Sequence, residues 1–217
     1  GYLYALKLAT GELIERWRGG PNENRVLGNT QIVSRWPARG GVVIRDDVLY
    51  WGAGIWQSEG IFLHAMNPET GERLWTNDTS GGIEMPQPHG GANAKSGVSA
   101  QGYLLASDQQ LFVPTGRAVP AAFHRSNGEF EYYRLQENTQ IGHTTAVVHG
   151  DLFYNGGYAY QAVDGSVLAD RLPGVVAAYP GGVIHGTANR LAALTVGTKE
   201  TVDRRGDKVV VPAHNER

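Results

Sequence analysis

Apolar and polar residues alternate along this chain in short runs that end in glycine-containing turns, which is typical of β-hairpins. The clearest example spans 63–75, where an apolar run ends in a turn closed by Gly71 and a second run ends at Trp75. The pattern recurs with more variation at 3–14, 121–130 and 160–168, with turn glycines Gly11, Gly128 and Gly165. A hairpin repeated in this way predicts a stacked or radial array of similar units.

A second type of hairpin lies between these units and adds two strands to each. Residues 41–52 form two β-rich runs divided by Asp46-Asp47, and related hairpins occupy 102–113, 145–154 and 175–184. Each precedes a glycine-turn hairpin or its remnant, so each pair predicts a four-stranded antiparallel sheet, with strands A to D in chain order. The predicted sheets span 41–78, 102–135, 144–172 and 175–217, after a C–D half at 2–18. The last is irregular, because 203–208 resembles an insertion before strand D.

Repeated four-stranded sheets without helical periodicity predict an all-β fold, a β-propeller of antiparallel blades. A β-sandwich would not need paired hairpins in a repeating order, and a β-solenoid would have shorter and more regular repeats. About four to five blades can be drawn, and the first of them is only a half-blade. A propeller protects the edges of its sheets by closing into a ring, which a half-blade at one end does not complete. We therefore expect 1–217 to be one propeller domain, a segment of a seven- or eight-bladed ring within a longer chain.

Composition excludes several classes of function. The 30 glycines and 10 prolines among 217 residues are spread through the turns, as many short strands require. The formal net charge of −2 gives no reason to expect a nucleic-acid partner. No run of about 18 apolar residues predicts a transmembrane segment. The chain has no cysteine, which excludes disulfides and thiolate chemistry.

The repeat resembles that of pyrroloquinoline-quinone (PQQ) type propellers. The matching pattern, A-x-(N/D)-x-x-T-G-E-x-x-W, is carried by Ala65, Asn67, Thr70, Gly71, Glu72 and Trp75, with a partial copy at Ala5, Thr10, Gly11 and Glu12. Segments 36–41, 54–56 and 114–120 further resemble bacterial, often multidomain, PQQ-like propeller proteins. The resemblance implies structural roles for the repeat residues. The turn glycine takes a backbone conformation that other residues resist, and Trp75 docks on the neighbouring blade.

The same resemblance implies two different activities. Quinoprotein dehydrogenases of this fold hold PQQ with a calcium ion bound by Glu and Asn, and they use a catalytic Asp and often a vicinal disulfide, which this chain cannot form. The propeller subunit of the outer-membrane β-barrel assembly machinery shares the repeat and binds no quinone. The repeat therefore supports the fold more than an activity. We expect the chain to bind no metal or cofactor. Binding of PQQ with calcium would be expected only if the chain is a dehydrogenase.

The predicted strand order sorts the connections onto two faces of the propeller. The short A–B and C–D turns lie on one face, which we call the short-turn face. The B–C loops and D–A connections lie on the other face, which we call the long-loop face. Long segments at 19–40, 79–101, 136–143, 54–60 and 114–117 make the long-loop face the expected binding surface. We select from it side chains that bind anions, stack on rings or donate hydrogen bonds: Arg39, Trp56, Gln57, His89, Arg117 and His143. Each also has a structural interpretation, as a blade cap or a partner of loop carbonyls.

No other motif assigns a catalytic function. The seven histidines show no metal-ligand spacing such as H-x-x-x-H. His64 and His124 lie at different offsets from their turn glycines, and we expect both to be structural. The chain has no P-loop, G-x-G-x-x-G or G-x-S-x-G sequence.

Three functions fit the sequence, in decreasing order of preference. The first is a non-catalytic PQQ-like propeller that acts as a binding or assembly scaffold in an extracytoplasmic bacterial protein, periplasmic or extracellular. The second is a PQQ- and calcium-dependent quinoprotein dehydrogenase, and the third is a polysaccharide-binding or carbohydrate-active propeller. The expected partners are a protein or a carbohydrate on the long-loop face, and the rest of the ring from the same or another chain.

Overall fold

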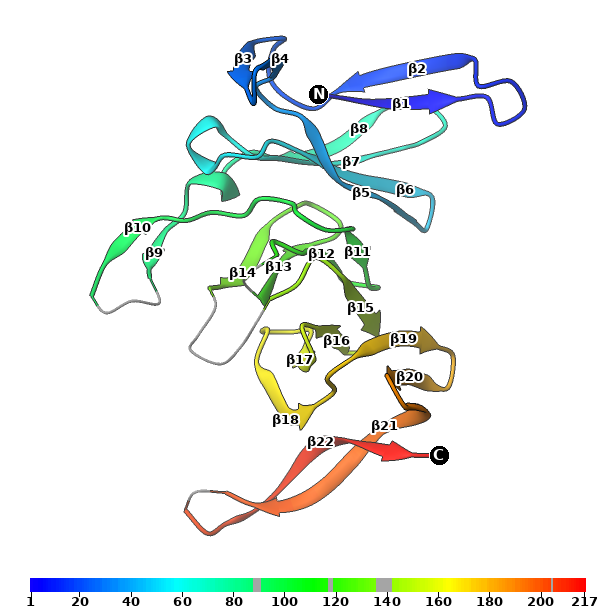
Figure 1. Ribbon diagram of the computed structural model, residues 1–217, viewed down its shortest axis with the longest axis vertical. Coiled ribbons are helices and arrows are strands. Elements are labelled where there is room, and N and C mark those ends of the chain that lie inside the picture. The colour runs from blue at the N-terminus through cyan, green and yellow to red at the C-terminus, as the bar shows by residue number, and fades with distance from the viewer. Residues whose placement is uncertain (88–90, 117–118, 136–141, 204) are drawn as a thin grey trace.

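The computed structural model describes residues 1–87, 91–116, 119–135, 142–203 and 205–217. A two-stranded sheet is followed by four four-stranded antiparallel sheets, each built from consecutive strands in chain order. Figure 1 shows these sheets in succession along the long axis of the molecule, with the chain termini near opposite ends. The predicted all-β architecture of four-stranded antiparallel units is therefore confirmed.

The strands of each sheet run from A to D in the order of the chain. The first sheet holds only β1 (Tyr2–Leu6) and β2 (Leu13–Arg18). The second holds β5 (Ala38–Arg45), β6 (Val48–Ala53), β7 (Phe62–Met66) and β8 (Arg73–Asn77). The third holds β11 (Leu105–Ala106), β12 (Gln110–Val113), β13 (Val119–His124) and β14 (Phe130–Arg134).

The last two sheets have the same order. The fourth holds β15 (Ala146–His149), β16 (Leu152–Asn155), β17 (Tyr158–Gln161) and β18 (Val167–Arg171). The fifth holds β19 (Val175–Tyr179), β20 (Gly182–Thr187), β21 (Arg190–Val202) and β22 (Lys208–Glu216). The A strands β5, β11, β15 and β19 contact one another in sequence, as the innermost strands of propeller blades do.

Two D–A connections that we expected to be loops contain short hairpins. Residues 19–40 include β3 (Arg25–Gly28) and β4 (Gln31–Ser34), joined by Asn29 and Thr30 with φ values of 49° and 66°. Positive φ at both central residues is characteristic of a two-residue hairpin turn whose twist matches the twist of the flanking strands. Residues 79–101 include the 3₁₀ turn η2 (Ser80–Gly82), β9 (Glu84–Pro86) and β10 (Asn93–Lys95). A second 3₁₀ turn, η1 (Gln57–Glu59), lies in a B–C loop.

The glycine turns adopt one backbone conformation at all four predicted positions. The φ values lie between 68° and 73° at Gly11, Gly71, Gly128 and Gly165. Residues with a side chain avoid this region. The N–H of each glycine donates to the carbonyl four residues earlier, at 2.8 or 2.9 Å. The register also shifts just before each turn, between Ala65 and Met66 for example. The same local structure therefore recurs at each copy of the sequence pattern.

An aromatic residue of each of the D strands β2, β8 and β14 packs on the turn glycine of the next sheet. A Cβ placed on Gly128 would lie 2.4 Å from the Trp75 ring, and one on Gly165 would lie 2.7 Å from the Tyr132 ring. Trp17 contacts Gly71 in the same way, with Nε1 at 2.7 Å from the position of such a Cβ. Glycine is required here because any side chain would displace the ring. This contact confirms the docking role that the resemblance implied for Trp75.

The hydrophobic core is divided into layers between successive sheets. Leu63 and Tyr50 of the second sheet pack with Leu111 and Phe123 of the third. Comparable clusters lie between the third and fourth sheets and between the fourth and fifth. Most of the segment 97–104 is also buried, and its Leu104 N–H donates to the Gly40 carbonyl at 2.9 Å. Part of the 79–101 connection therefore belongs to the core and is not available as a binding loop.

The fifth sheet ends in a long hairpin. Nine residue pairs join β21 and β22, from Leu194–Glu216 to Val202–Lys208, and Figure 1 shows the hairpin extending away from the other sheets. Of the segment 203–208, which we expected to be an insertion before strand D, the described residues 203 and 205–207 lie at its tip, and Lys208 begins β22. There the Asp203 carboxylate accepts main-chain hydrogen bonds from Arg205 and Asp207 at 2.8 and 2.9 Å.

Candidate functional site

The sequence-selected residues that the structure describes lie on separate elements. Trp56 precedes η1 and is 42% exposed. The neighbouring Gln57 donates from Nε2 to the Gly97 carbonyl at 3.3 Å, which joins the B–C loop to the following D–A connection. Trp56 is therefore open to solvent, whereas the Gln57 amide is used within the protein.

Arg39 lies in a strand, contrary to the expectation that it belongs to a loop. It is the second residue of β5 and pairs with Gly52 of β6. Strand pairing starts this early because the Pro37 carbonyl already accepts a 2.9 Å hydrogen bond from the Gly54 N–H. The preceding turn is fixed by Trp36, whose indole donates to the Glu59 carbonyl at 2.6 Å. His89 and Arg117 lie outside the described residues.

Among the selected residues that the structure describes, His143 lines a cavity. This cavity, of about 390 Å³, lies on the long-loop face between the fourth and fifth sheets, and its walls include Tyr154, Tyr158 and Pro173. Buried Asn155 holds the loop in place, because it accepts from the His143 N–H at 2.8 Å and donates to the Thr145 carbonyl at 2.8 Å. Arg39, Trp56 and Gln57 do not line this cavity, so it does not unite the selected residues.

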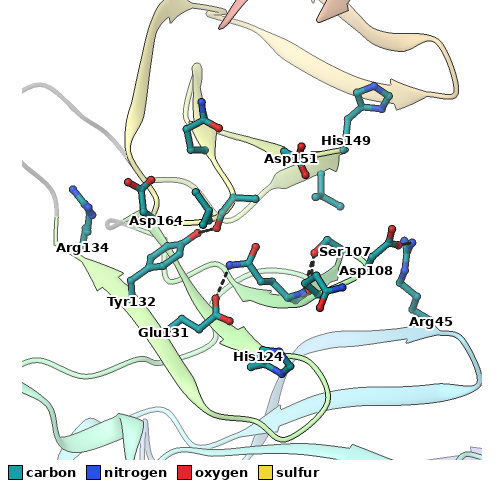
Figure 2. A pocket seen from close by; sticks show the side chains of 17 residues that line it. Arg45, Ser107, Asp108, His124, Glu131, Tyr132, Arg134, His149, Asp151 and Asp164 are labelled. Atoms are coloured by element: carbon teal, nitrogen blue, oxygen red, sulfur yellow. Dashed lines mark hydrogen bonds and ion pairs between the residues drawn. The ribbon is translucent and has the colours of Figure 1, made fainter. Parts of the chain in front are cut away.

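A larger cavity, of about 1080 Å³, opens on the opposite, short-turn face (Figure 2). It lies between the third and fourth sheets, and Arg45 at the end of β5 adds a contribution from the second. The rest of its lining comes from the A–B turns at 107–110 and 148–151, the C–D turn at 161–164, strand β14, and His124 at the end of β13. We call it the short-turn cavity. Its position differs from the sequence expectation, which assigned binding to the long-loop face.

Contacts between the third and fourth sheets hold one wall of the short-turn cavity. The Tyr132 hydroxyl donates to the Ala162 carbonyl at 2.6 Å, and burial raises the pKa of this phenol well above its usual value. Gln110 donates from Nε2 to the Glu131 carboxylate at 2.5 Å. Figure 2 shows both contacts inside the cavity. The positions of Tyr132 and Glu131 are therefore set by packing between rigid strands.

Charged residues surround the same cavity. Arg45 pairs with Asp108 of the third sheet and donates to the Ala106 carbonyl at 3.3 Å. Asp164 accepts hydrogen bonds from Ser166. These hydrogen bonds and the positive charge of Arg134 lower the pKa of the Asp164 carboxyl group. Glu131 and Asp151 add two more carboxylates. Carboxylates therefore outnumber guanidinium groups by four to two along the lining.

Sequence reasoning missed the residues of this cavity because they come from six separated segments. A weak signal was present: the short turns are acidic, with Asp46, Asp47, Asp108, Asp151 and Asp164. Their convergence depends on the placement of one sheet against the next, which a turn motif does not specify. The described residues contain no group of three or more His, Asp or Glu side chains arranged to hold a metal ion. Within the described residues, no helix has the length and apolarity that are needed to cross a membrane.

No protein-family model matches the chain, and no curated protein matches it. Among solved structures, BamB from Moraxella catarrhalis is similar in fold, with a TM-score of 0.53 and 17% identity over 90% of this chain. Quinohemoprotein alcohol dehydrogenase from Comamonas testosteroni aligns with 60% of this chain and 20% of its own, at a TM-score of 0.39 and 15% identity. The likeness to BamB, together with the succession of four-stranded antiparallel sheets, shows the fold of a PQQ-like β-propeller. The chain spans 49% of the BamB chain that it matches.

Proposed function

We propose that this chain is a non-catalytic PQQ-like propeller segment that acts as a binding and assembly scaffold in an extracytoplasmic bacterial protein. The observation that supports a scaffold most directly is the fixed packing of successive sheets, in which Trp17, Trp75 and Tyr132 lie against turn glycines of the next sheet. The bacterial and extracytoplasmic part of the proposal follows the sequence resemblance. The fold likeness to BamB supports the propeller architecture on which the proposal depends.

Residues at one repeat position differ sharply in exposure between the first sheet and the second. Leu6 and Met66 both lie five residues before the turn glycine, yet Leu6 is 54% exposed and Met66 is 3% exposed. Tyr4 and His64, seven residues before the glycine, are 53% and 1% exposed. Met66 lies beside Leu49 and Trp51 of strand β6, and Leu3 and Trp17 of the first sheet pack against this cluster. The corresponding face of β1 therefore lacks both a neighbouring B strand and the residues of a preceding sheet.

A hairpin with A and B strands is the partner that fits this surface. Strand β1 pairs with β2 along one edge, whereas β7 pairs with both β6 and β8. An unpaired strand edge beside an apolar face accepts a further strand through main-chain hydrogen bonds. The rest of the ring, from the same or another chain, would supply that hairpin.

Tethering a surrogate hairpin tests this assembly. Residues 38–53 of the chain, an A–B hairpin, would be joined ahead of Gly1 by a flexible Gly-Ser linker, which raises their effective concentration at β1. We expect hydrogen exchange at the β1 amides to slow at least tenfold, with no change when the tethered residues are scrambled. Equal exchange for both fusions would rule out completion of the first sheet by an A–B hairpin.

The absence of catalysis is tested separately with cofactor. The protein would be incubated with PQQ and Ca²⁺, and quinone absorbance and dye-linked alcohol oxidation would be measured. We expect neither stoichiometric quinone binding nor oxidation above the level of a protein-free control. Saturable PQQ binding with alcohol oxidation would replace the scaffold proposal with a quinoprotein dehydrogenase.

A further inference from the structure

We propose that the short-turn cavity binds a basic, extended peptide segment of a partner protein. This inference depends on the proposed scaffold function and adds to it a specific surface and a partner chemistry. It assigns binding to the face of the propeller that carries the short turns, where the sequence pattern placed only structural residues.

The size and rigidity of the cavity are sufficient for an extended peptide segment. Small-molecule sites usually measure about 300–1,000 Å³, and this cavity measures about 1080 Å³. It lies along the boundary between two sheets that Tyr132 joins through its 2.6 Å hydrogen bond to Ala162. An elongated segment can follow such a boundary without any rearrangement of the scaffold.

The charges of the lining favour a cationic segment. The Arg45–Asp108 ion pair uses one guanidinium and one carboxylate. Of the other charged side chains in the lining, Glu131, Asp151 and Asp164 are acidic and Arg134 is basic. Glu131 comes from β14 of the third sheet and Asp151 from a turn of the fourth, so carboxylates face the cavity from both walls. A lysine or arginine between these walls would reduce the repulsion among them.

The uncharged groups of the lining fit a peptide backbone. Gln109 and Gln161 present amide groups, which can both donate to a carbonyl and accept from an N–H. Gln110 binds one Glu131 oxygen and so orients that carboxylate. An anionic partner is disfavoured by the excess of carboxylates, and a neutral glycan would gain nothing from that excess. The net charge of the lining therefore distinguishes these ligands.

Fluorescence anisotropy with labelled octapeptides tests the proposal. The probes are an alternating Lys-Ser peptide, the equivalent Glu-Ser peptide and a labelled neutral maltooligosaccharide. We expect saturable binding of the Lys-Ser peptide only. The double variant Glu131→Gln, Asp151→Asn should weaken binding about fivefold, the size expected for two exposed charge contacts. A matched control, Glu84→Gln with Glu200→Gln, removes the same charge from exposed positions on other elements and should change affinity less than twofold.

Substitution of Arg134 gives an independent test with the opposite sign. Arg134→Gln removes a positive charge from the cavity and should tighten binding of the Lys-Ser peptide about twofold. Weaker binding in this variant, equal losses in both double variants, or binding of the oligosaccharide alone would overturn the proposal. Each variant would first be checked for an unchanged melting temperature. The tethered-hairpin experiment reports on β1 and not on this cavity, so the two proposals can fail separately.

Discussion

The indole Nε1 of Trp75 donates a 2.9 Å hydrogen bond to the main-chain carbonyl of Arg125 in the next sheet. Tyr132 repeats this relationship one sheet further on, through its 2.6 Å bond to the Ala162 carbonyl. In both cases the acceptor lies three residues before the turn glycine on which the ring packs. Ring packing and a directional hydrogen bond therefore act together to set the position of each sheet on its neighbour.

Trp75→Ala should lower the free energy of unfolding by about 3 kcal/mol, the lower end of the range for large aromatic truncations, because Trp75 is only partly buried. The loss combines the ring contact with Gly128 and the hydrogen bond to Arg125. Urea unfolding followed by circular dichroism measures it. Trp56→Ala serves as the control, since Trp56 is exposed, and its unfolding free energy should change by less than about 1 kcal/mol. Similar losses in both variants would contradict the docking role of Trp75.

Gly128→Ala should destabilise the protein more than Gly11→Ala. Both glycines have φ near +70°, so each substitution places alanine in left-handed backbone at a cost of about 1–2 kcal/mol. A Cβ on Gly128 would also collide with the Trp75 ring, whereas one on Gly11 meets no atom within 4 Å. The difference between the two midpoints of urea unfolding isolates the collision. Equal midpoints would show that the ring moves aside without cost.

His64 should make stability depend on pH below neutrality. Burial lowers the pKa of this imidazole from 6.5 to about 4. Its Nε2 lies 2.8 Å from the Gly19 carbonyl and its Nδ1 lies 3.0 Å from the Thr76 hydroxyl. The neutral ring therefore donates from Nε2 and accepts at Nδ1. Protonation removes that acceptor and puts a charge in the core.

The sign of this effect follows from proton linkage. The folded state binds the His64 proton more weakly than the unfolded state, so its contribution is complete above pH 6.5 and is lost as the pH falls toward 4. The total is on the order of 3 kcal/mol, at about 1.4 kcal/mol per pH unit. Urea unfolding at pH 7 and pH 4.5 should show a smaller pH dependence for His64→Gln than for the parent protein. His124→Gln, which alters a less buried histidine, should leave the parent dependence intact.

Asp46→Asn should have a small effect that salt removes. Asp46 accepts from Arg125 of the next sheet at 2.6 Å and lies 3.7 Å from Arg45. The carboxylate is largely exposed, so the pairs contribute at most about 1 kcal/mol, and asparagine tolerates the positive φ of 49°. Unfolding free energies should differ in low salt and converge in 1 M NaCl, where the Debye length is about 3 Å. A difference that persists in high salt would indicate a steric role.

The sheets were predictable from sequence because their signal is local. Gly11, Gly71, Gly128 and Gly165 mark turns whose backbone conformation only glycine adopts readily, and the flanking apolar runs supply the strands. The β3–β4 hairpin had a local signal too, in Val26, Leu27, Ile32 and Val33 around Asn29-Thr30. It was missed because it stands outside the four-strand repeat.

The cavity between sheets was not predictable, because its position depends on contacts between residues distant in sequence. Tyr132 and Ala162 are thirty residues apart, and neither carries a recognisable motif. Arg39 shows a smaller limit of the same kind, since the start of β5 is determined by its pairing with β6. Loop length alone therefore did not indicate where the larger cavity lies, while His143 does line the smaller one.

The docking of each aromatic residue on the following sheet has a mechanical consequence. Contacts between four-stranded sheets join neighbours such as β11 to β15 and β15 to β19, so cohesion is a series of nearest-neighbour terms. A force applied to the two termini would load all of these interfaces in series, and the weakest would separate first. Optical-trap extension should therefore show separate steps, each releasing one sheet. Truncating Trp75 should lower the force of the step that separates the second sheet from the third.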